Sequence, residues 1–271
     1  MNLDLTKYFS HHQIINHGGE NLLFSQSCRL LTIGPSKIGK STLILECLKA
    51  KKFPSSHSKV LLCNPNFSEE SVDKDFIENL RAAISPTELK TMDHIPSLKE
   101  LQEEIANQKM RNNANLMIIC DDFGDECFSS QAIMQIFTRY SAHNNIDCIL
   151  ILQNAFSKEK YYSIIVRNTT HFIVFNVVLD RLVFSYLSKK MFPKNNQHLE
   201  YCMQYTLEKF GNRAYICING DVLNPLLKSY ETLTQIIPYQ DHDMSPSNSA
   251  MGYPIFFPNP PQSLTYQDYF S

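Results

Sequence analysis

The sequence contains no hydrophobic run long enough to cross a membrane. No window of about 18 consecutive apolar residues occurs in its 271 residues. The N-terminal stretch carries Asp4, Lys7 and Glu20 in place of the apolar core of a secretory signal. We therefore expect a protein that is neither secreted nor membrane-spanning. Its 43% of apolar residues can bury a core as one large or two small domains.

The cysteines lack a metal-binding pattern. The chain has eight, none of them in a C-x-x-C pair, and most lie inside apolar runs. A free cysteine in such a run behaves as a small hydrophobic residue. The pattern is typical of a protein in a reducing compartment and argues against a structural zinc site.

The chain also lacks an excess of charge of either sign. Its formal net charge is −2, from 25 lysines and arginines against 27 acids. The molecule as a whole therefore has no electrostatic attraction for nucleic acid. If it binds DNA, it must use a local basic surface or the lumen of a ring, so net charge neither supports nor excludes DNA as a partner.

Apolar runs of strand length alternate with helical patterns along the chain. The runs are 28–33, 59–63, 116–120, 148–152, 172–177 and 214–218. Because they are apolar on both faces, they favour a mainly parallel sheet flanked by helices, which is an α/β fold. In the segment 131–140 the apolar residues have helical spacing, and Arg139 lies off the apolar stripe, so we expect it to face outward.

A phosphate-binding loop follows the first of these runs. The sequence has the form G-x-x-x-x-G-K-S/T, the Walker A signature, between a strand pattern and a helix pattern. Lys40 is expected to reach the β- and γ-phosphates of a nucleotide, and Ser41 to ligate Mg²⁺. The predicted nucleotide-binding residues are Gly34, Pro35, Ser36, Lys37, Ile38, Gly39, Lys40, Ser41 and Thr42.

A second motif, made of two acidic residues, follows the run 116–120. Asp121 and Asp122 follow this buried strand pattern in the form of a Walker B motif. We expect Asp121 to hold Mg²⁺ and Asp122 to polarise the attacking water. The alternative interpretation is a strand followed by an acidic turn, which the intact Walker A loop upstream makes the weaker one.

Gln153 closes the run 148–152. In the additional-strand class of P-loop ATPases, one strand lies between the Walker A and Walker B strands, and a polar residue at its tip meets the γ-phosphate. Ligands of open α/β sheets bind at the carboxyl ends of the strands. We therefore predict that Gly34, Asp121 and Gln153 converge there. The alternative is that Gln153 is merely a polar residue that ends a strand.

In residues 137–156, F-T-R-Y-S-A-H-N-N-I-D-C-I-L-I-L-Q-N-A-F, an Arg and a His precede a predicted strand that ends in Gln-Asn. This segment gives the chain a resemblance to the viral genome-packaging ATPases of the FtsK–HerA superfamily. The resemblance covers about residues 28–238 and is greatest to packaging ATPases of Polinton/Maverick elements, adintoviruses and related viruses, which are allied to the poxvirus enzyme. Further matching pieces are Arg167-Asn168, 171–175, Asp180-Arg181 and 191–193.

The resemblance implies a motor that uses ATP and Mg²⁺ to drive double-stranded DNA into a preformed capsid. It further implies a homo-oligomeric ring, a pentamer or hexamer, a capsid or portal partner, no membrane partner, and a location in the nucleus or cytoplasm of the host cell. The fold implied is a P-loop NTPase of the additional-strand, RecA/FtsK-like type. An arginine from a neighbouring subunit usually completes phosphoryl transfer in such enzymes. Arg139 and Arg167 are the candidates, and Arg139 is favoured because it matches the arginine before the His.

Other P-loop proteins remain as alternative interpretations. A GTPase should carry N-K-x-D, and a nucleotide kinase an arginine-rich lid, and neither occurs in the sequence. A cellular HerA/FtsK-like DNA translocase and a nucleotide-switch binding module also remain. Against the switch, Lys40, Ser41, Asp121 and Asp122 are all present.

These motifs predict three regions in the chain. Residues 1–27 form an N-terminal extension, 28–238 the P-loop ATPase domain, and 239–271 a tail. The tail holds five prolines, and four of them, Pro254, Pro258, Pro260 and Pro261, lie among aromatic residues, so we expect it to be disordered or to dock on a partner.

Deletion of residues 242–271 should leave ATPase activity and thermal stability nearly unchanged, because a Pro-rich segment contributes little to a packed core. Turnover and the melting temperature of the shortened protein check this. A large fall in melting temperature would show instead that the tail aromatics pack on the domain.

Overall fold

The computed structural model describes most of the predicted ATPase domain. It covers Phe24 and residues 27–53, 57–68, 74–84, 87–110, 115–154, 156–175, 182–191, 199–200, 203, 207, 215–219 and 226–229. The predicted tail 239–271, and the extension 1–27 apart from Phe24 and Ser27, lie outside the described residues. The chain divides into two compact units, Leu22–Phe175 and Met1–Asn21 with Asn176–Ser271.

The unit Leu22–Phe175 is built on a parallel sheet with the strand order β3-β2-β4-β5-β1-β6. The strand β5 lies between β1, which leads into the Walker A loop, and β4, which ends in the Walker B acids. This is the topology predicted for an additional-strand P-loop fold, and the prediction is confirmed. The strands are β1 (Arg29–Ile33), β2 (His57–Cys63), β3 (Glu88–Met92), β4 (Asn115–Asp121), β5 (Ile146–Leu152) and β6 (His171–Phe175).

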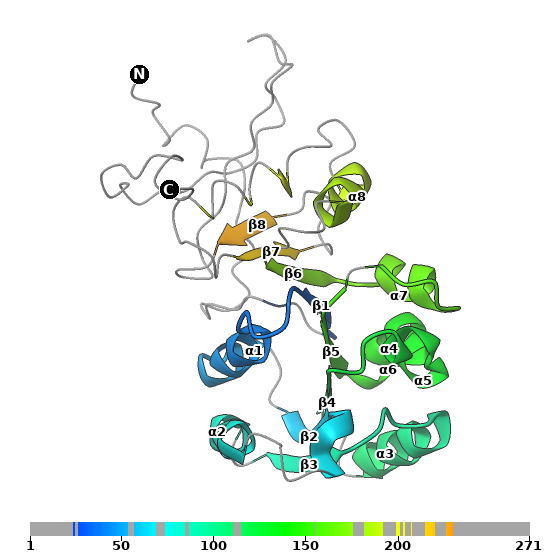
Figure 1. The fold of residues 1–271 in the computed structure, drawn as a ribbon. Helices are drawn as coiled ribbons and strands as arrows, with labels where there is room; N and C mark the ends of the chain where they lie inside the picture. The colour runs from blue at the N-terminus through cyan, green and yellow to red at the C-terminus, as the bar shows by residue number, and fades with distance from the viewer. Residues whose placement is uncertain are drawn as a thin grey trace, which may run out of the picture. The chain divides into compact units, whose positions relative to one another are not determined.

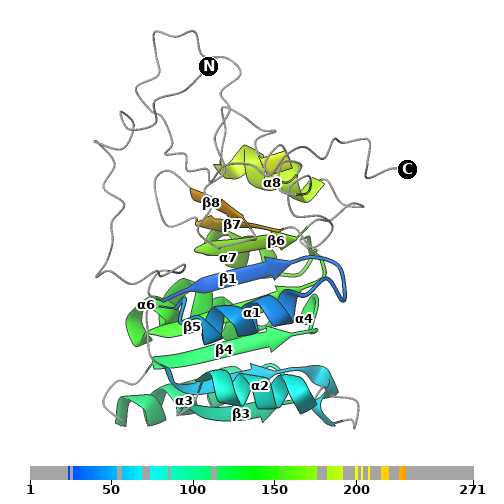
Figure 2. The same cartoon turned by 90° about the vertical axis from the view of Figure 1, so that its left-hand side faces the viewer.

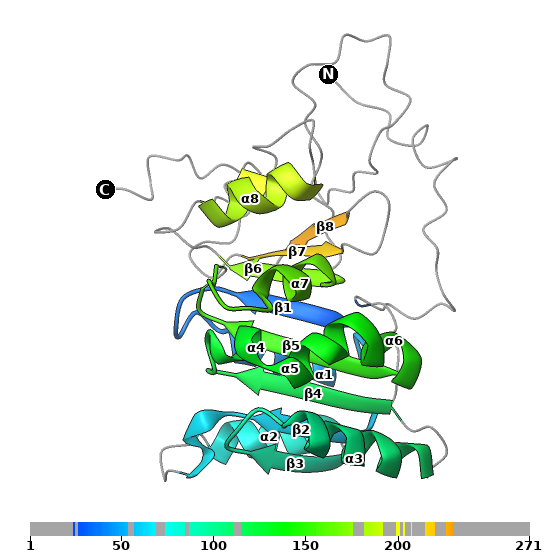
Figure 3. The ribbon, with the colours of Figure 1, turned by 90° about the vertical axis from the view of Figure 1, so that its right-hand side faces the viewer.

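Helices cover both faces of this sheet (Figure 1). The first two, α1 (Lys40–Lys49) and α2 (Lys74–Ile84), lie on one face, and the others lie on the opposite face (Figures 2 and 3). These others are α3 (Leu98–Met110), α4 (Glu126–Ser129), α5 (Gln131–Gln135), α6 (Ser141–Asn144) and α7 (Tyr162–Arg167). None of the described helices is long and apolar enough to span a bilayer.

The segment 131–140, which we predicted as one helix, changes its backbone hydrogen-bonding pattern partway along. A π-helical turn, Ile136–Tyr140, separates α5 from α6. Ile133, Ile136 and Phe137 are fully buried, and Arg139 is exposed as predicted. Turns of π-helix inside longer helices occur frequently at functional sites.

The second unit is described only in part. Helix α8 (Leu182–Met191) buries Phe184 and Leu187. The predicted run 214–218 forms β7 (Tyr215–Asn219), which pairs antiparallel with β8 (Leu226–Ser229).

The central strands are buried along their whole length, as their apolar sequences predict. Every residue of β5 and β6 is buried. The described cysteines are all buried free thiols, which agrees with their placement in apolar runs. The amino ends of β2 and β5 are joined by a polar contact, since the Nε2 of His57 lies 2.6 Å from the Oδ2 of Asp147. Asp147 also accepts the backbone N–H of Cys28 at 2.6 Å, so it ties the start of β1 to β5.

The edge strand β3 was not predicted, because its sequence, ELKTM, is polar. It is held by a charged network instead of an apolar face. Lys59 of β2 contacts Glu88 at 3.0 Å and Glu104 of α3 at 2.9 Å, and Lys90 contacts Glu104 at 2.9 Å. Burial raises the pKa of Glu104, but the hydrogen bonds and charges of the two lysines outweigh it and bring the pKa below its ordinary value of 4.5.

Glu104→Gln should lower the free energy of unfolding by about 1–3 kcal/mol at neutral pH, because it leaves a buried lysine with less compensation. A lowered pKa means that this contribution is fully present above pH 4.5 and is lost as the pH falls through the lower, folded-state value. Denaturant unfolding of the wild-type protein and of Glu104→Gln at about pH 7 and about pH 3 should therefore show their free energies of unfolding converging in acid.

The matched control is Glu103→Gln on the same helix. Glu103 is 63% exposed and lies 3.9 Å from Lys99, so its loss should change stability little. An equal loss of stability in both variants would contradict the role given to the Glu104 network.

Candidate nucleotide site

The Walker A loop curls between β1 and α1 at the carboxyl edge of the sheet. Gly39 is the N-cap residue of α1 and has φ +102°, a left-handed conformation that side chains rarely adopt. A glycine at this position has no side chain that could bond the first N–H groups of the helix. These donors, with the positive end of the helix dipole, therefore remain available to phosphate oxygens.

Gly34 is fixed by close approach on two sides. Its N–H donates to the carbonyl of Leu152 at the end of β5, at 3.2 Å. A Cβ atom at Gly34 would lie 2.7 Å from the Cβ of Phe175 at the end of β6, which is closer than real Cβ contacts. Only glycine therefore fits between the two strands that flank β1. Neither Phe175 nor Leu152 was singled out from the sequence, because an apolar residue that ends a strand carries no distinguishing signal.

Lys40 lies over the loop. Its Nζ donates to the carbonyls of Gly34 at 2.9 Å and Pro35 at 2.8 Å, and the residue is only 8% exposed. Burial lowers the pKa of the Lys40 ammonium, while the charges of Asp121 and Asp122 act to raise it. The ammonium is thus held in the loop by two backbone carbonyls, a position from which it could bind phosphate groups.

Ser41 and Asp121 meet across the site. The Oγ of Ser41 donates to the Oδ2 of Asp121 at 2.6 Å. Burial raises the pKa of Asp121, the hydrogen bond from Ser41 opposes this, and the nearby charge of Asp122 adds to the rise. A hydroxyl and a carboxylate held together are hard oxygen donors of the kind that Mg²⁺ prefers. The residues present therefore fit the metal that the motifs predict.

Asp122 and Gln153 form a second contact beside the first. The Nε2 of Gln153 donates to the Oδ1 of Asp122 at 3.1 Å. Asp122 has φ +64°, a left-handed conformation that is uncommon outside glycine but is tolerated by Asp and Asn. Such conformations cost free energy and gather at functional sites. This turn directs the two adjacent acids to different partners, Asp121 to Ser41 and Asp122 to Gln153.

The structure thus brings Gly34, Lys40, Ser41, Asp121, Asp122 and Gln153 together at one edge of the sheet. The strand register accounts for this, because Ile33 pairs with Leu152 and Asp121 pairs with Ile151. Within the loop, Pro35, Ser36, Lys37 and Thr42 are exposed and Ile38 is half-buried.

The two candidate arginines lie outside this cluster. Arg139 is eight residues beyond the start of α5, or about 12 Å along a helix that runs away from the site. Its side chain is exposed and makes no hydrogen bond or ion pair with another described residue. Arg167, at the end of α7, donates to the Oγ of Ser163 at 2.9 Å.

Several solved structures resemble this one. The genome packaging NTPase B204 from Sulfolobus turreted icosahedral virus 2, in complex with AMPPCP, has 15% identity and a TM-score of 0.49 over 75% of this chain and 97% of that chain. The DNA-packaging ATPase B204 from Sulfolobus turreted icosahedral virus has 15% identity and a TM-score of 0.44 over 74% and 97%. A KaiC-like protein from Pyrococcus horikoshii has 14% identity and a TM-score of 0.34 over 56% and 73%.

Sequence comparison identifies the family. No match to the chain is found among curated proteins. The family model described as Poxvirus A32 protein matches residues 17–224, which is most of the chain and includes both Walker motifs, β5 and Arg139. The resemblance to viral genome-packaging ATPases is thereby confirmed, and the chain belongs to the Poxvirus A32 protein family.

Proposed function

We propose that the protein hydrolyses ATP at the Walker site and uses the energy to move viral double-stranded DNA into a capsid. The observation that carries the proposal is the hydrogen bond from Ser41 to Asp121, which joins the two Walker motifs in one site. Family membership supports the same conclusion. A capsid or portal component would be the second partner, and the infected cell, in nucleus or cytoplasm, the place of action.

Each residue of the site has a distinct proposed role. The Lys40 ammonium would bind the β- and γ-phosphates of ATP and offset the charge that develops on them. Asp122 would accept a proton from the attacking water, and Gln153 would orient that water and the γ-phosphate. Their 3.1 Å contact supports this pairing, since it holds the carboxylate and the amide side by side.

Ser41 and Asp121 are the proposed ligands of Mg²⁺. The described residues contain no group of three or more His, Cys, Asp or Glu side chains that could hold a metal by themselves. We infer that phosphate oxygens and water complete the coordination, as is usual for this ion. When held by Ser41 and Asp121, Mg²⁺ would neutralise negative charge that develops on the phosphate groups.

We further propose that the protein works as a homo-oligomeric ring, a pentamer or hexamer, in which Arg139 acts on the nucleotide of the neighbouring subunit. Arg139 is too far along its helix to serve its own site. Its exposure, its lack of a described partner and its place in a π-helical turn support a role between subunits. Arg167 is already bonded to Ser163, which makes it the second candidate.

Asp122→Asn should keep ATP binding and reduce hydrolysis by two or more orders of magnitude, because the amide cannot accept the proton. Asparagine tolerates the left-handed backbone at this position, so the fold should be retained. Nucleotide affinity and single-turnover hydrolysis, measured on the same preparation, check this.

Asp125→Asn is the matched control for Asp122→Asn. Asp125 is an exposed acid three residues along the chain and makes no capping bond with its side chain. The Asp125→Asn variant should hydrolyse ATP at the normal rate. Loss of ATP binding in Asp122→Asn, with normal hydrolysis of the nucleotide that still binds, would reverse the roles of the two Walker B acids.

Mixing Arg139→Ala subunits with Lys40→Ala subunits should restore part of the activity that each variant lacks alone. A mixed ring contains interfaces at which both groups are intact, and an arginine supplied in trans contributes on the order of a thousandfold to turnover. Steady-state ATPase assays of the two variants and their mixtures test this. A mixture that exchanges subunits but stays inactive would remove the trans role from Arg139 and favour Arg167.

A further inference from the structure

The two edges of the sheet differ in charge. The carboxyl edge holds the acids Asp121, Asp122, Asp125 and Glu126 around the nucleotide site. The helices α1, α2, α3, α6 and α7 each lead into a strand of the parallel sheet and end at the opposite, amino edge, and the last turn of each carries a basic residue. These residues are Lys49, Arg81, Lys109, His143 and Arg167. These basic residues lie on both faces of the sheet, and Lys49 is paired with Glu46 at 2.9 Å. Lys109 makes no ion pair with another described residue, so its charge is available at the amino edge.

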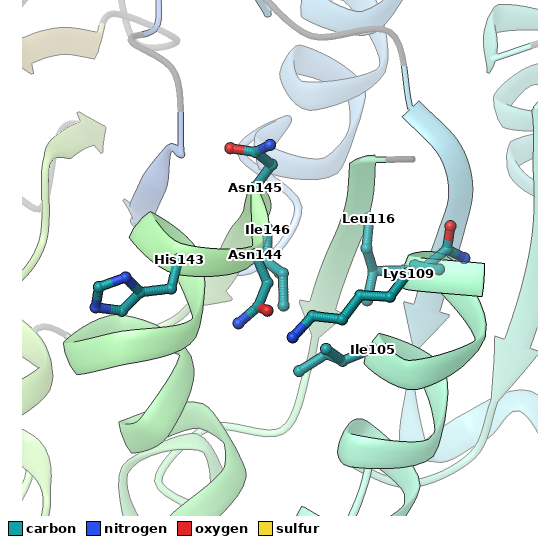
Figure 4. Close-up of a pocket in the computed structure, with 8 residues that line it drawn as sticks. Ile105, Lys109, Leu116, His143, Asn144, Asn145 and Ile146 are labelled. Atoms are coloured by element: carbon teal, nitrogen blue, oxygen red, sulfur yellow. The ribbon is translucent and has the colours of Figure 1, made fainter. Parts of the chain in front are cut away.

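A cavity of about 110 Å³ lies within this edge, between the ends of α3 and α6. Its floor is apolar, from Ile105, Leu116 and Ile146, and its rim is polar, from Gln108, Lys109, His143, Asn144 and Asn145. No carboxylate lines it. Figure 4 shows the Lys109 side chain extending from α3 toward Asn144, while the ring of His143 points away from Lys109. We call Lys109, His143, Asn144 and Asn145 the α3–α6 rim.

The rim has the chemistry of a phosphate contact. Lysine and amide N–H groups are the side-chain donors that proteins use for the nucleic-acid backbone. At about 110 Å³ the cavity is larger than the space that a single water needs, so it has room for a small polar group such as a phosphate. The carbonyl dipoles at the two helix ends oppose an anion, but their effect falls off within the last turn. The Lys109 side chain is long and exposed, so its ammonium lies beyond the last helical turn and can attract an anion there.

The α3–α6 rim is separate from the nucleotide site. Leu116 and Ile146 lie at the start of β4 and β5, and the Walker B acids and Gln153 lie at or just beyond their other ends. A strand of seven residues spans about 20 Å, so nucleotide phosphates bound at Lys40 are out of reach of Lys109.

We propose that the α3–α6 rim binds phosphodiester groups of double-stranded DNA, with Lys109 as the principal contact. This inference rests on the proposed function, which requires a DNA-binding surface that the net charge does not supply. It places that surface at the amino edge, opposite the nucleotide. The strands β4 and β5 then have the DNA contact at one end and the hydrolytic residues at the other.

The test compares Lys109→Gln with Lys99→Gln in the full-length protein. Both lysines are exposed and both lie on α3, but Lys99 is at the carboxyl-edge end of the helix and is 86% exposed. Affinity for a short duplex of mixed sequence, measured by fluorescence anisotropy over a range of salt, gives the slope of log affinity against log salt. Loss of one phosphate contact should make this slope shallower by about 0.9 in Lys109→Gln alone. ATP turnover without DNA should be unchanged in both variants.

Equal salt slopes in the two lysine variants, with wild-type protein that binds DNA, would overturn the assignment of the rim but leave the proposed function intact. Wild-type protein that binds no DNA at low salt would count against the proposed function itself. A second experiment measures the binding of inorganic phosphate to the same proteins. Phosphate that binds at the rim, while DNA affinity stays independent of Lys109, would overturn the DNA proposal in favour of a site for free anions.

Discussion

The hydrogen bond between Ser41 and Asp121 depends on the strand order of the sheet. The two residues follow β1 and end β4, which are not neighbours, because β5 lies between them. The contact therefore spans a third strand, whose tip is free to take part in the site. Gln153 is the residue at that tip, and its bond to Asp122 is a direct result of the inserted strand.

The site forms a closed set of contacts. Lys40 bonds the carbonyl of Gly34, and the N–H of Gly34 bonds the carbonyl of Leu152, the residue before Gln153. Gln153 bonds Asp122, and its neighbour Asp121 bonds Ser41, which follows Lys40. A shift of any one strand end would therefore alter the geometry of both Walker motifs.

Much of this architecture could be predicted from the sequence. The central strands can be recognised because a strand covered on both faces is mostly apolar. In β4, β5 and β6 the polar residues are few: Asn115, Asp121, Asp147 and His171. The spacing of glycines and lysine identifies the Walker A loop. The two glycines are required there because Gly39 has a positive φ and Gly34 must fit beside Phe175. The convergence of Gly34, Asp121 and Gln153 was predicted from the topology of additional-strand P-loop ATPases, but the bond of Gln153 to Asp122 was not.

What the sequence did not reveal depends on pairing across long separations. The polar edge strand β3 is stabilised by Lys59 and Glu104, which lie on other elements, so its own residues carry little strand signal. The contact of His57 with Asp147 joins two strands that are not adjacent, and neither residue has a motif around it. The π-helical turn that holds Arg139 is likewise invisible in an apolar pattern with ordinary helical spacing.

ATP hydrolysis at this site is proposed to serve the movement of DNA. The most direct test is the ATP turnover of the full-length protein as double-stranded DNA is added. We expect a Mg²⁺-dependent rate that rises with DNA concentration and saturates. A rate that is substantial but independent of DNA would contradict the proposal, and would indicate a P-loop enzyme whose hydrolysis serves another purpose.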